Sequence, residues 1–462
     1  MQFCTKLVTY NMTRISIKHI FAGLLMSLIL PGYAQQNLSL KDALTYALEN
    51  SNLMTQARLD IENGYNQVQE ARASALPQIN ATGTLTNNVK VTSFVLPASF
   101  MGGPADEFIA IRAGQTWGSV LQVTLSQQIY NQQLFAGLKA AKGSAELYKI
   151  AAAVAEENVL QQVAAAYYQV VITRQNTTVL DANIKRVSEL ETILASQFDA
   201  GLVRKVDLDR VRVNKANLES QKAELLNGIQ QVENLLKYYM GMPVNNEIKI
   251  SETAFAELEQ FAGSITGQDN FDINQLVSYQ ALKKQEELLE LNVKVKKAEY
   301  VPYLYLSGYY TYNTSSNKFN LYTDKALSYD MSAFTLNLSI PIFDGLAKHA
   351  RIKTAKANLE RQRSDIRNTE NALQMSYNNA TFQIQNSLKT IGAQQLNKDL
   401  AQEVYDMTNA NYQNGLATLT DLINAEADLV TAQNSYNDAL LKLKVAQIEL
   451  LKSNGKIGTL LN

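Results

Sequence analysis

Cysteine and histidine are almost missing from this chain of 462 residues, and their scarcity excludes most kinds of reactive site. The only cysteine is Cys4, and the only histidines are His19 and His349. Cysteine and histidine metal clusters, disulfide frameworks and Ser-His or Cys-His catalytic pairs therefore have almost no residues to use. His349 stands in Lys348-His349-Ala350-Arg351, which is typical of a solvated helix face. We therefore expect neither an enzyme nor a cofactor or metal site.

Strong charge and long apolar runs are also lacking. The net charge is −1, so nothing draws the chain toward nucleic acid, and no late apolar run is long enough for a membrane helix. The N-terminus differs, because basic residues precede an apolar run over 20–30 and the small-residue pattern Pro31-Gly32-Tyr33-Ala34. This predicts a signal peptide over 1–34 and export across the inner membrane. Met12 is an alternative start, and no cysteine follows the run to carry a lipid.

Proline is rare after this leader, where it occurs only at 77, 97, 104, 243, 302 and 341. Two long spans, 105–242 and 342–462, are therefore free of helix breakers. Within them the pattern predicts helices over 131–200 and 344–414, each about 70 residues or roughly 100 Å long. Shorter helices are predicted over about 39–75, 208–240, 272–299 and 421–452.

A seven-residue repeat runs through the predicted helices. It is clearest at the C-terminal end, where large residues at one seam position alternate with alanine at the other. This pattern is typical of closely packed coiled coils. The large residues there are Leu422, Leu429, Tyr436, Leu443 and Leu450, and the alanines are Ala425, Ala432, Ala439 and Ala446. The same spacing recurs at Val211, Leu218, Leu225, Val232 and Tyr239, and at Ile352, Leu359, Ile366, Leu373 and Ala380.

The chain is an internal duplication. Phe198-Asp199-Ala200-Gly201-Leu202 with Asp207 returns as Tyr412-Gln413-Asn414-Gly415-Leu416 with Asp421 at the same distance. Residues 121–130 resemble 334–343, and 76–79 resemble 301–304, in the same order. Glycine favours a helix stop and the following aspartate a helix start, so each motif predicts the tip of a helical hairpin. The fold is thus one long unit, present twice.

Four segments alternate apolar and polar residues and predict strands, near 79–85, 121–125, 304–312 and 334–340. The connections 87–118 and 313–331 resemble exposed loops. In an exported chain these strands fit an outer-membrane barrel, although half-buried strands of a soluble sheet have the same alternation. Four strands cannot close a barrel, so two, three or four chains would share one of 8, 12 or 16 strands.

These signals divide the chain as follows: signal peptide 1–34, N-terminal helix of the first repeat 35–76, first barrel hairpin 77–130, first long helical hairpin 131–242, connector 243–271, helix of the second repeat 272–300, second barrel hairpin 301–343, second long helical hairpin 344–453, and C-terminal tail 454–462.

The chain resembles the TolC-like outer-membrane efflux protein family. The likeness runs from Leu38-Ser39-Leu40-Lys41-Asp42-Ala43 to the C-terminal heptads and includes both Gly-Leu tips. It implies a mainly α fold with a β-barrel contribution, in which a homotrimer builds a 12-stranded barrel in outer-membrane lipids and a periplasmic α-helical tunnel. It also implies a periplasmic adaptor and an inner-membrane transporter of RND or ABC type as partners.

The resemblance also implies roles for residues at the tips. Tyr412, Asp421 and Asn424 occupy positions of the pore constriction, although Asn424 stands where a second aspartate ring is found and Ala417 where a gate-linking arginine is found. Asp421 and Asp207 also suit a plain helix-start role. The turns that would face the adaptor are Gly201-Leu202-Val203 and Gly415-Leu416-Ala417.

Other classes of protein share some of these features. A periplasmic coiled-coil adaptor, or a structural protein without a pore, is the alternative, but it does not account for two hairpins that alternate with two strand pairs. Within the channel class, multidrug efflux, metal-ion efflux and type I protein secretion are all compatible with the scaffold.

Overall fold

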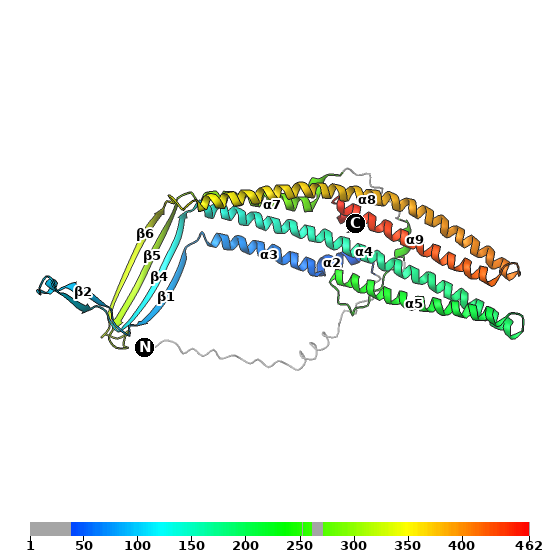
Figure 1. Ribbon diagram of the computed structural model, residues 1–462, viewed down its shortest axis with the longest axis horizontal. Helices are drawn as coiled ribbons and strands as arrows, with labels where there is room; N and C mark the ends of the chain where they lie inside the picture. The colour runs from blue at the N-terminus through cyan, green and yellow to red at the C-terminus, as the bar shows by residue number, and fades with distance from the viewer. Residues whose placement is uncertain (1–37, 252, 261–270, 462) are drawn as a thin grey trace, which may run out of the picture.

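A shaft of long helices ends in a small β-sheet (Figure 1). The structure is a computed structural model, described here for residues 38–251, 253–260 and 271–461. The predicted signal peptide and part of the predicted connector 243–271 lie outside the described residues. None of the described helices has the length and apolar character needed to cross a membrane.

Both halves contain a helical segment, two long strands, a long helix and a shorter helix in the same order, and the first half has an additional small hairpin between its two long strands. The first half consists of α2 (Leu40–Asn50), α3 (Asn52–Ala73), β1 (Gln78–Asn87), β2 (Ser93–Pro97), η1 (Ala98–Met101), β3 (Phe108–Arg112), β4 (Trp117–Tyr130), α4 (Gln132–Asp199), α5 (Lys205–Met240) and α6 (Ala254–Gln260). The second half consists of η2 (Ile273–Gln275), α7 (Val277–Ala298), β5 (Tyr303–Ser316), β6 (Leu327–Ser339), α8 (Ala347–Gln413), α9 (Leu419–Ser453) and η3 (Ile457–Leu461). The long helices α4 and α8 have 68 and 67 residues, and α5 and α9 have 36 and 35, which confirms the duplication.

The seven-residue repeat marks buried positions. Leu422, Leu429, Tyr436, Leu443 and Leu450 are all buried along α9. In α5 the seam is fully buried only at Val211 and Leu218, toward the tip. Helix α4 lies at the centre, since it packs against α3, α5, α7 and α9, while α8 packs along α9 and α7. The heptads thus describe the packing of helix pairs, as predicted.

The helix predicted over 39–75 is wrong as a single element, because the structure has two helices there. Ser51, which is 2 % exposed and extended at ψ 143°, ends α2 and caps α3 by accepting a hydrogen bond from the Met54 amide. The guanidinium of Arg58 donates to the carbonyls of Leu48 and Glu49 at the end of α2. The turn after α5 packs against this break, because a Cβ at Gly241 would overlap the carbonyl oxygen of Asn50. The end of α5 therefore packs closely against the break between α2 and α3.

The four predicted strands form one antiparallel sheet in the order β1-β4-β5-β6. The central pair β4 and β5 joins the two halves, and β1 and β6 are the edges. The register aligns apolar residues on one face, with Leu304 opposite Leu338 and Leu306 opposite Leu336. Leu336 and Leu338 are each 63 % exposed. The helices lie beyond one end of the sheet and not on its faces (Figure 1), so this apolar face is not half-buried in a soluble core.

The connection 87–118, expected as an exposed loop, contains a second small sheet. Strands β2 and β3 pair as a hairpin, with Phe94 opposite Ile111 and Leu96 opposite Ile109. The hairpin projects beyond the end of the four-stranded sheet that is remote from the helices (Figure 1). The apolar residues of this segment have the alternating spacing of strands, which could have predicted the hairpin. The glycines and proline at 102–104 instead favoured a loop over the whole segment.

Gly241 and Gly201 provide a matched test of the joint between α5 and Ser51. Both have positive φ, at 73° and 72°, so alanine costs each of them about 1 kcal/mol of backbone strain. Only Gly241 has backbone atoms in the way, whereas nothing lies within 4 Å of a Cβ at Gly201. We expect Gly241→Ala to lower the thermal midpoint, followed by circular dichroism, much further than Gly201→Ala. Equal shifts would contradict this packing.

Candidate functional site

The two helical hairpins end side by side at the end of the shaft remote from the sheet (Figure 1). Both turns have the same backbone geometry. Gly201 has φ 72° and Gly415 has φ 75°. The amide of Leu202 donates to the carbonyl of Gln197 at 2.8 Å, and the amide of Leu416 donates to that of Asn411 at 2.8 Å. These are helix stops that glycine makes without strain, as predicted for hairpin tips.

The outermost side chains of the tips are apolar and exposed. Leu202 is 75 % exposed and Leu416 is 80 % exposed. The residues that follow them, Val203 and Ala417, are half-buried, and Val203 packs against the core of the tip. Exposed apolar side chains that gather at one end of an elongated protein are typical of surfaces that contact another protein.

The two hairpins restart their second helices differently. In the second hairpin Thr418 and Asp421 form a capping box, in which the Thr418 amide and hydroxyl donate to Asp421 Oδ2 at 2.9 and 2.6 Å. Hydrogen bonds from the Thr418 side chain and backbone hold the pKa of Asp421 below its usual value. In the first hairpin Arg204 replaces the threonine and donates to both carboxylate oxygens of Asp207, at 3.0 and 3.1 Å. Asp421 therefore caps a helix while its carboxylate faces solvent.

The three predicted constriction residues do not gather at one point. Asp421 and Asn424 are both exposed and lie one turn apart on α9. Tyr412 is half-buried among the residues that join the two hairpins, including Leu208 and Leu419. Burial raises the pKa of Tyr412, and the charge of Asp207 raises it further. Tyr412 thus packs toward the first hairpin, whereas the side chains of Asp421 and Asn424 are exposed.

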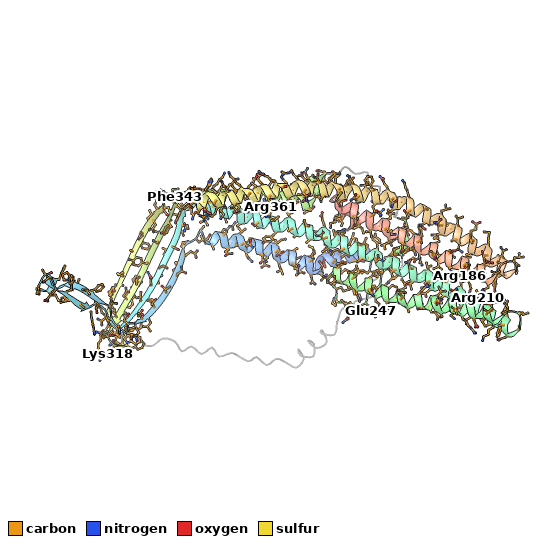
Figure 2. All side chains as sticks on the ribbon, in the orientation of Figure 1. Arg186, Arg210, Glu247, Lys318, Phe343 and Arg361 are labelled. Atoms are coloured by element: carbon orange, nitrogen blue, oxygen red, sulfur yellow. The ribbon has the colours of Figure 1, made fainter. Side chains whose placement is uncertain are left out.

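Two of the polar links between the hairpins lie toward the tip end of the shaft, and neither was predicted. Near the tip the Arg210 guanidinium donates to the Thr420 hydroxyl at 2.9 Å. Farther from the tip Arg186 on α4 forms an ion pair with Glu426 on α9, with Nε 3.0 Å from Oε1. Arg186 and Arg210 lie near the tip end of the shaft in Figure 2. These partners are more than 200 residues apart in sequence, and no local pattern pairs them.

The Arg186 ion pair is the more buried of the two links. Glu426 is 3 % exposed, and Arg186 also lies over the ring of Tyr405, 5.4 Å from its centre. Burial raises the pKa of Glu426, and the hydrogen bond and charge of Arg186 oppose that rise. The contacts of Arg186 therefore join α4 to both helices of the second hairpin, to α8 through Tyr405 and to α9 through Glu426.

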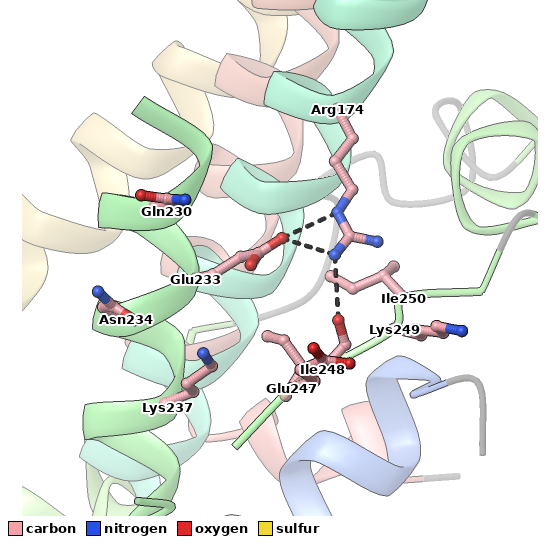
Figure 3. A pocket seen from close by; sticks show the side chains of 9 residues that line it. All are labelled: Arg174, Gln230, Glu233, Asn234, Lys237, Glu247, Ile248, Lys249 and Ile250. Atoms are coloured by element: carbon pink, nitrogen blue, oxygen red, sulfur yellow. Dashed lines mark hydrogen bonds and ion pairs between the residues drawn. The ribbon is translucent and has the colours of Figure 1, made fainter. Parts of the chain in front are cut away.

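A groove of about 700 Å³ lies halfway along the shaft, where the connector after α5 meets α4 and α5 (Figure 3). Charged side chains in this groove are paired within the protein: Arg174 forms an ion pair with Glu233 at 2.6 Å and donates to the Ile248 carbonyl at 3.2 Å. Lys237 donates to the Val244 carbonyl at 3.0 Å. The groove therefore has the character of a structural joint and not of a reactive site. In the described parts of the chain, no group of three His, Cys, Asp or Glu residues is placed to hold a metal ion.

Comparison with known proteins identifies the family. The family described as "Outer membrane efflux protein" matches residues 43–242 and 278–456, which include both helical hairpins and both tips. The chain belongs to this family. Outer membrane protein TolC of Vibrio cholerae is 21 % identical over 435 residues, covering 91 % of each chain. Protein CyaE of Bordetella pertussis is 25 % identical, covering 74 % of this chain and 71 % of that protein.

Solved structures show the same fold. The outer membrane protein VceC of Vibrio cholerae has a TM-score of 0.68 at 16 % identity, covering 91 % of this chain and 97 % of its own. The CmeC outer membrane channel of Campylobacter jejuni has a TM-score of 0.70 at 16 % identity, covering 90 % and 85 %. The predicted family, fold and location in the outer membrane with a long periplasmic extension are confirmed. The protein is an outer-membrane export channel, and nothing in these comparisons supports the alternative of an adaptor or a structural coiled coil without a pore.

The Arg186–Glu426 pair permits a pH-resolved test. Arg186→Met leaves Glu426 buried without its partner, which costs about 3–5 kcal/mol when the carboxylate is charged. Burial raises the pKa of Glu426 in the folded protein, so the charged carboxylate destabilises the fold at pH 7. As the pH falls through this raised pKa, the carboxylate becomes protonated and the destabilisation disappears. We expect Arg186→Met to lower the thermal midpoint more at pH 7 than at pH 5. Arg186→Met with Glu426→Leu should recover most of the loss at pH 7, and equal losses at both pH values would contradict the argument.

Proposed function

We propose that three copies of this chain form one channel. In it three four-stranded sheets close a 12-stranded barrel in the outer membrane, and the helices continue the barrel as a tunnel through the periplasm. The observation that carries the proposal is the sheet itself, whose edges β1 and β6 are both open. Unpaired backbone groups are not tolerated in lipid, so the edges must pair with those of other copies.

The two faces of the sheet support this arrangement. The exposed leucines of β6 suit contact with lipid, and the opposite face carries polar pairs such as Asn80 with Thr124 and Ser307 with Thr335. An apolar outside with a polar inside is the pattern of membrane barrels that enclose water. Barrels of 8 or 16 strands would satisfy the same edges, and the resemblance to TolC-like channels favours 12.

The exposed tips would dock a periplasmic adaptor that couples the channel to an inner-membrane transporter of RND or ABC type. The surface consists of Gly201-Leu202-Val203 and Gly415-Leu416-Ala417. Support comes from the exposure of Leu202 and Leu416 at the end farthest from the sheet, where a transporter complex would be met. Apolar side chains in that position gain most from being covered by a partner.

Asp421 and Asn424 would line the narrow periplasmic end of the tunnel. Their exposure on one side of α9, one turn apart, supports this role. A ring of three carboxylates in a constriction attracts cations. Tyr412 would not line the constriction itself but would hold the second hairpin against the first, because it packs into the apolar cluster near the tip. The capping bond of Asp421 and its place in the pore are compatible, because the cap uses one carboxylate oxygen.

Electron microscopy of the mature protein in detergent tests both the assembly and the constriction. We expect a trimer with one shared barrel of 12 strands, and three copies of Asp421 and Asn424 around the narrowest point of the tunnel. The physical reason is that only copies of the same sheet can pair the edges β1 and β6 in lipid. A folded monomer with a closed barrel would overturn the assembly. A trimer whose narrowest point lies elsewhere would remove the pore role of Asp421 alone.

Charged substitutions at the tips test docking. Leu202→Asp with Leu416→Asp should abolish transport by the intact system in its native cells, because a charge cannot be buried in an apolar contact without a partner. Membrane insertion and trimer mass should be unchanged, since both side chains are exposed and make no core contact. Val213→Asp is the matched control, because Val213 is 61 % exposed on α5 but lies back from the turn. Normal transport by the double variant at normal abundance would refute docking at the tips.

A further inference from the structure

The β2–β3 hairpin presents apolar side chains on both of its faces. Phe94 and Leu96 lie on one face, 58 % and 37 % exposed. Val95 and Phe108 lie on the other, 64 % and 69 % exposed. At the tip Phe100 and Met101 are 79 % and 71 % exposed. Two strands with an apolar surface on every side do not form a stable unit in water, so this hairpin requires a partner.

The hairpin is not a loosely attached loop. The Asn88 amide donates to the Thr116 carbonyl at 2.7 Å, and the Ala113 amide donates to the Thr92 carbonyl at 3.0 Å. These bonds carry the β1–β4 pairing up to the base of β2–β3. The hairpin therefore projects as a directed extension of the barrel strands (Figure 1).

Its position relative to a second copy follows from the sheet order. The hairpin leaves the end of β1, which is an edge strand. In the proposed trimer β1 pairs with β6 of the next copy, antiparallel like the other pairs, so the end of β1 at Asn87 meets the start of β6 at Leu327. Residues 317–326 lead directly into β6 and form the β5–β6 loop. The hairpin of one copy and the β5–β6 loop of the next are thus brought together.

The β5–β6 loop offers a fixed apolar surface at that place. The Phe319 ring packs edge-on against Trp117, and the Tyr322 hydroxyl bonds the Ser119 hydroxyl at 2.8 Å, so the loop is held on its own strands. The Phe319 and Tyr322 side chains remain 70 % and 78 % exposed. Rigid aromatic groups with this exposure are typical anchors of protein interfaces.

We infer that the β2–β3 hairpin of each copy packs against the β5–β6 loop of the next copy, and that the three contacts form an apolar collar around the outer mouth of the channel. This rests on the trimer of the proposed function. The occupant is a second copy of this chain and not the surrounding lipid, because the hairpin projects beyond the sheet and its tip carries the charges of Asp106 and Glu107.

Cysteine cross-linking tests the collar, since Cys4 of the predicted leader is the only cysteine of the chain. Ala110→Cys with Asp324→Cys places one thiol on the hairpin, opposite Val95 on the paired strand, and one on the loop, both at exposed positions. A short bis-maleimide on the detergent-solubilised protein should convert most chains to covalent trimers on denaturing gels. The matched control is Ala110→Cys with Val213→Cys, whose second thiol is exposed on the helical shaft and should give none. Adding Phe94→Ser and Phe108→Ser to the first pair should abolish the covalent trimer.

The mass of the complex, measured in parallel by native mass spectrometry, separates the two proposals. A monomeric mass would overturn the trimer and the collar together. A trimeric mass with no covalent product, or with links within one chain alone, would overturn the collar and leave the trimer standing. A nitroxide at Phe100→Cys in liposomes adds a second measurement, and strong relaxation by membrane-dissolved oxygen would show that lipid covers the hairpin instead.

Discussion

An open sheet edge in lipid is the constraint on which the rest of this structure depends. Each chain contributes four strands, and the two outer strands, β1 and β6, have backbone groups that no strand of the same sheet pairs. Water would satisfy such groups at a soluble surface, but hydrocarbon does not. In the proposed trimer, a barrel shared among copies places the helices of all three chains around a common axis. The length of the tunnel is set by α4 and α8, and its location by the barrel.

Helix α4 is the element that holds one chain together along that length. It contacts helices of both repeats, and the central core contains its residues Val163, Tyr167 and Val170 beside Leu44 of α2 and Leu440 of α9. Toward the tip this core gives way to a smaller cluster and to polar links, including Arg186 with Glu426. Apolar seams resist separation at any pH, whereas buried ion pairs depend on the charge of their members. Near the tip the contact between the hairpins therefore depends on the charges of Arg186 and Glu426 as well as on apolar packing.

The two tips show how a duplicated turn acquires different properties. Gly201 and Gly415 end their helices with the same bonds, so the path of the chain is the same. At the next helix start Arg204 stands in one copy and Thr418 in the other. The first aspartate is consequently neutralised by an arginine, and the second is held by a hydroxyl and an amide that leave its charge in place. The residue at this one position therefore decides whether the helix-start aspartate is paired with an arginine or is held by neutral groups.

The sequence by itself determined the elements whose signals are local. Prolines, heptads and the two Gly-Leu turns predicted helices over 131–200 and 344–414, and α4 and α8 occupy Gln132–Asp199 and Ala347–Gln413. Strand alternation and the leader pointed to the outer membrane, and the tip residues could be named because their motif is contiguous. The break at Ser51 was missed because α2 and α3 share one helical period, and the β2–β3 hairpin because turn residues concealed two short strands.

Only the tertiary structure decided which distant residues meet. Arg186 and Glu426 are paired, Gly241 fits against Asn50, and Tyr412 turns inward while Asp421 stays exposed. The physical reason is that helix and strand periods specify which face of an element is apolar, but not which element will cover it or which polar groups that contact will enclose.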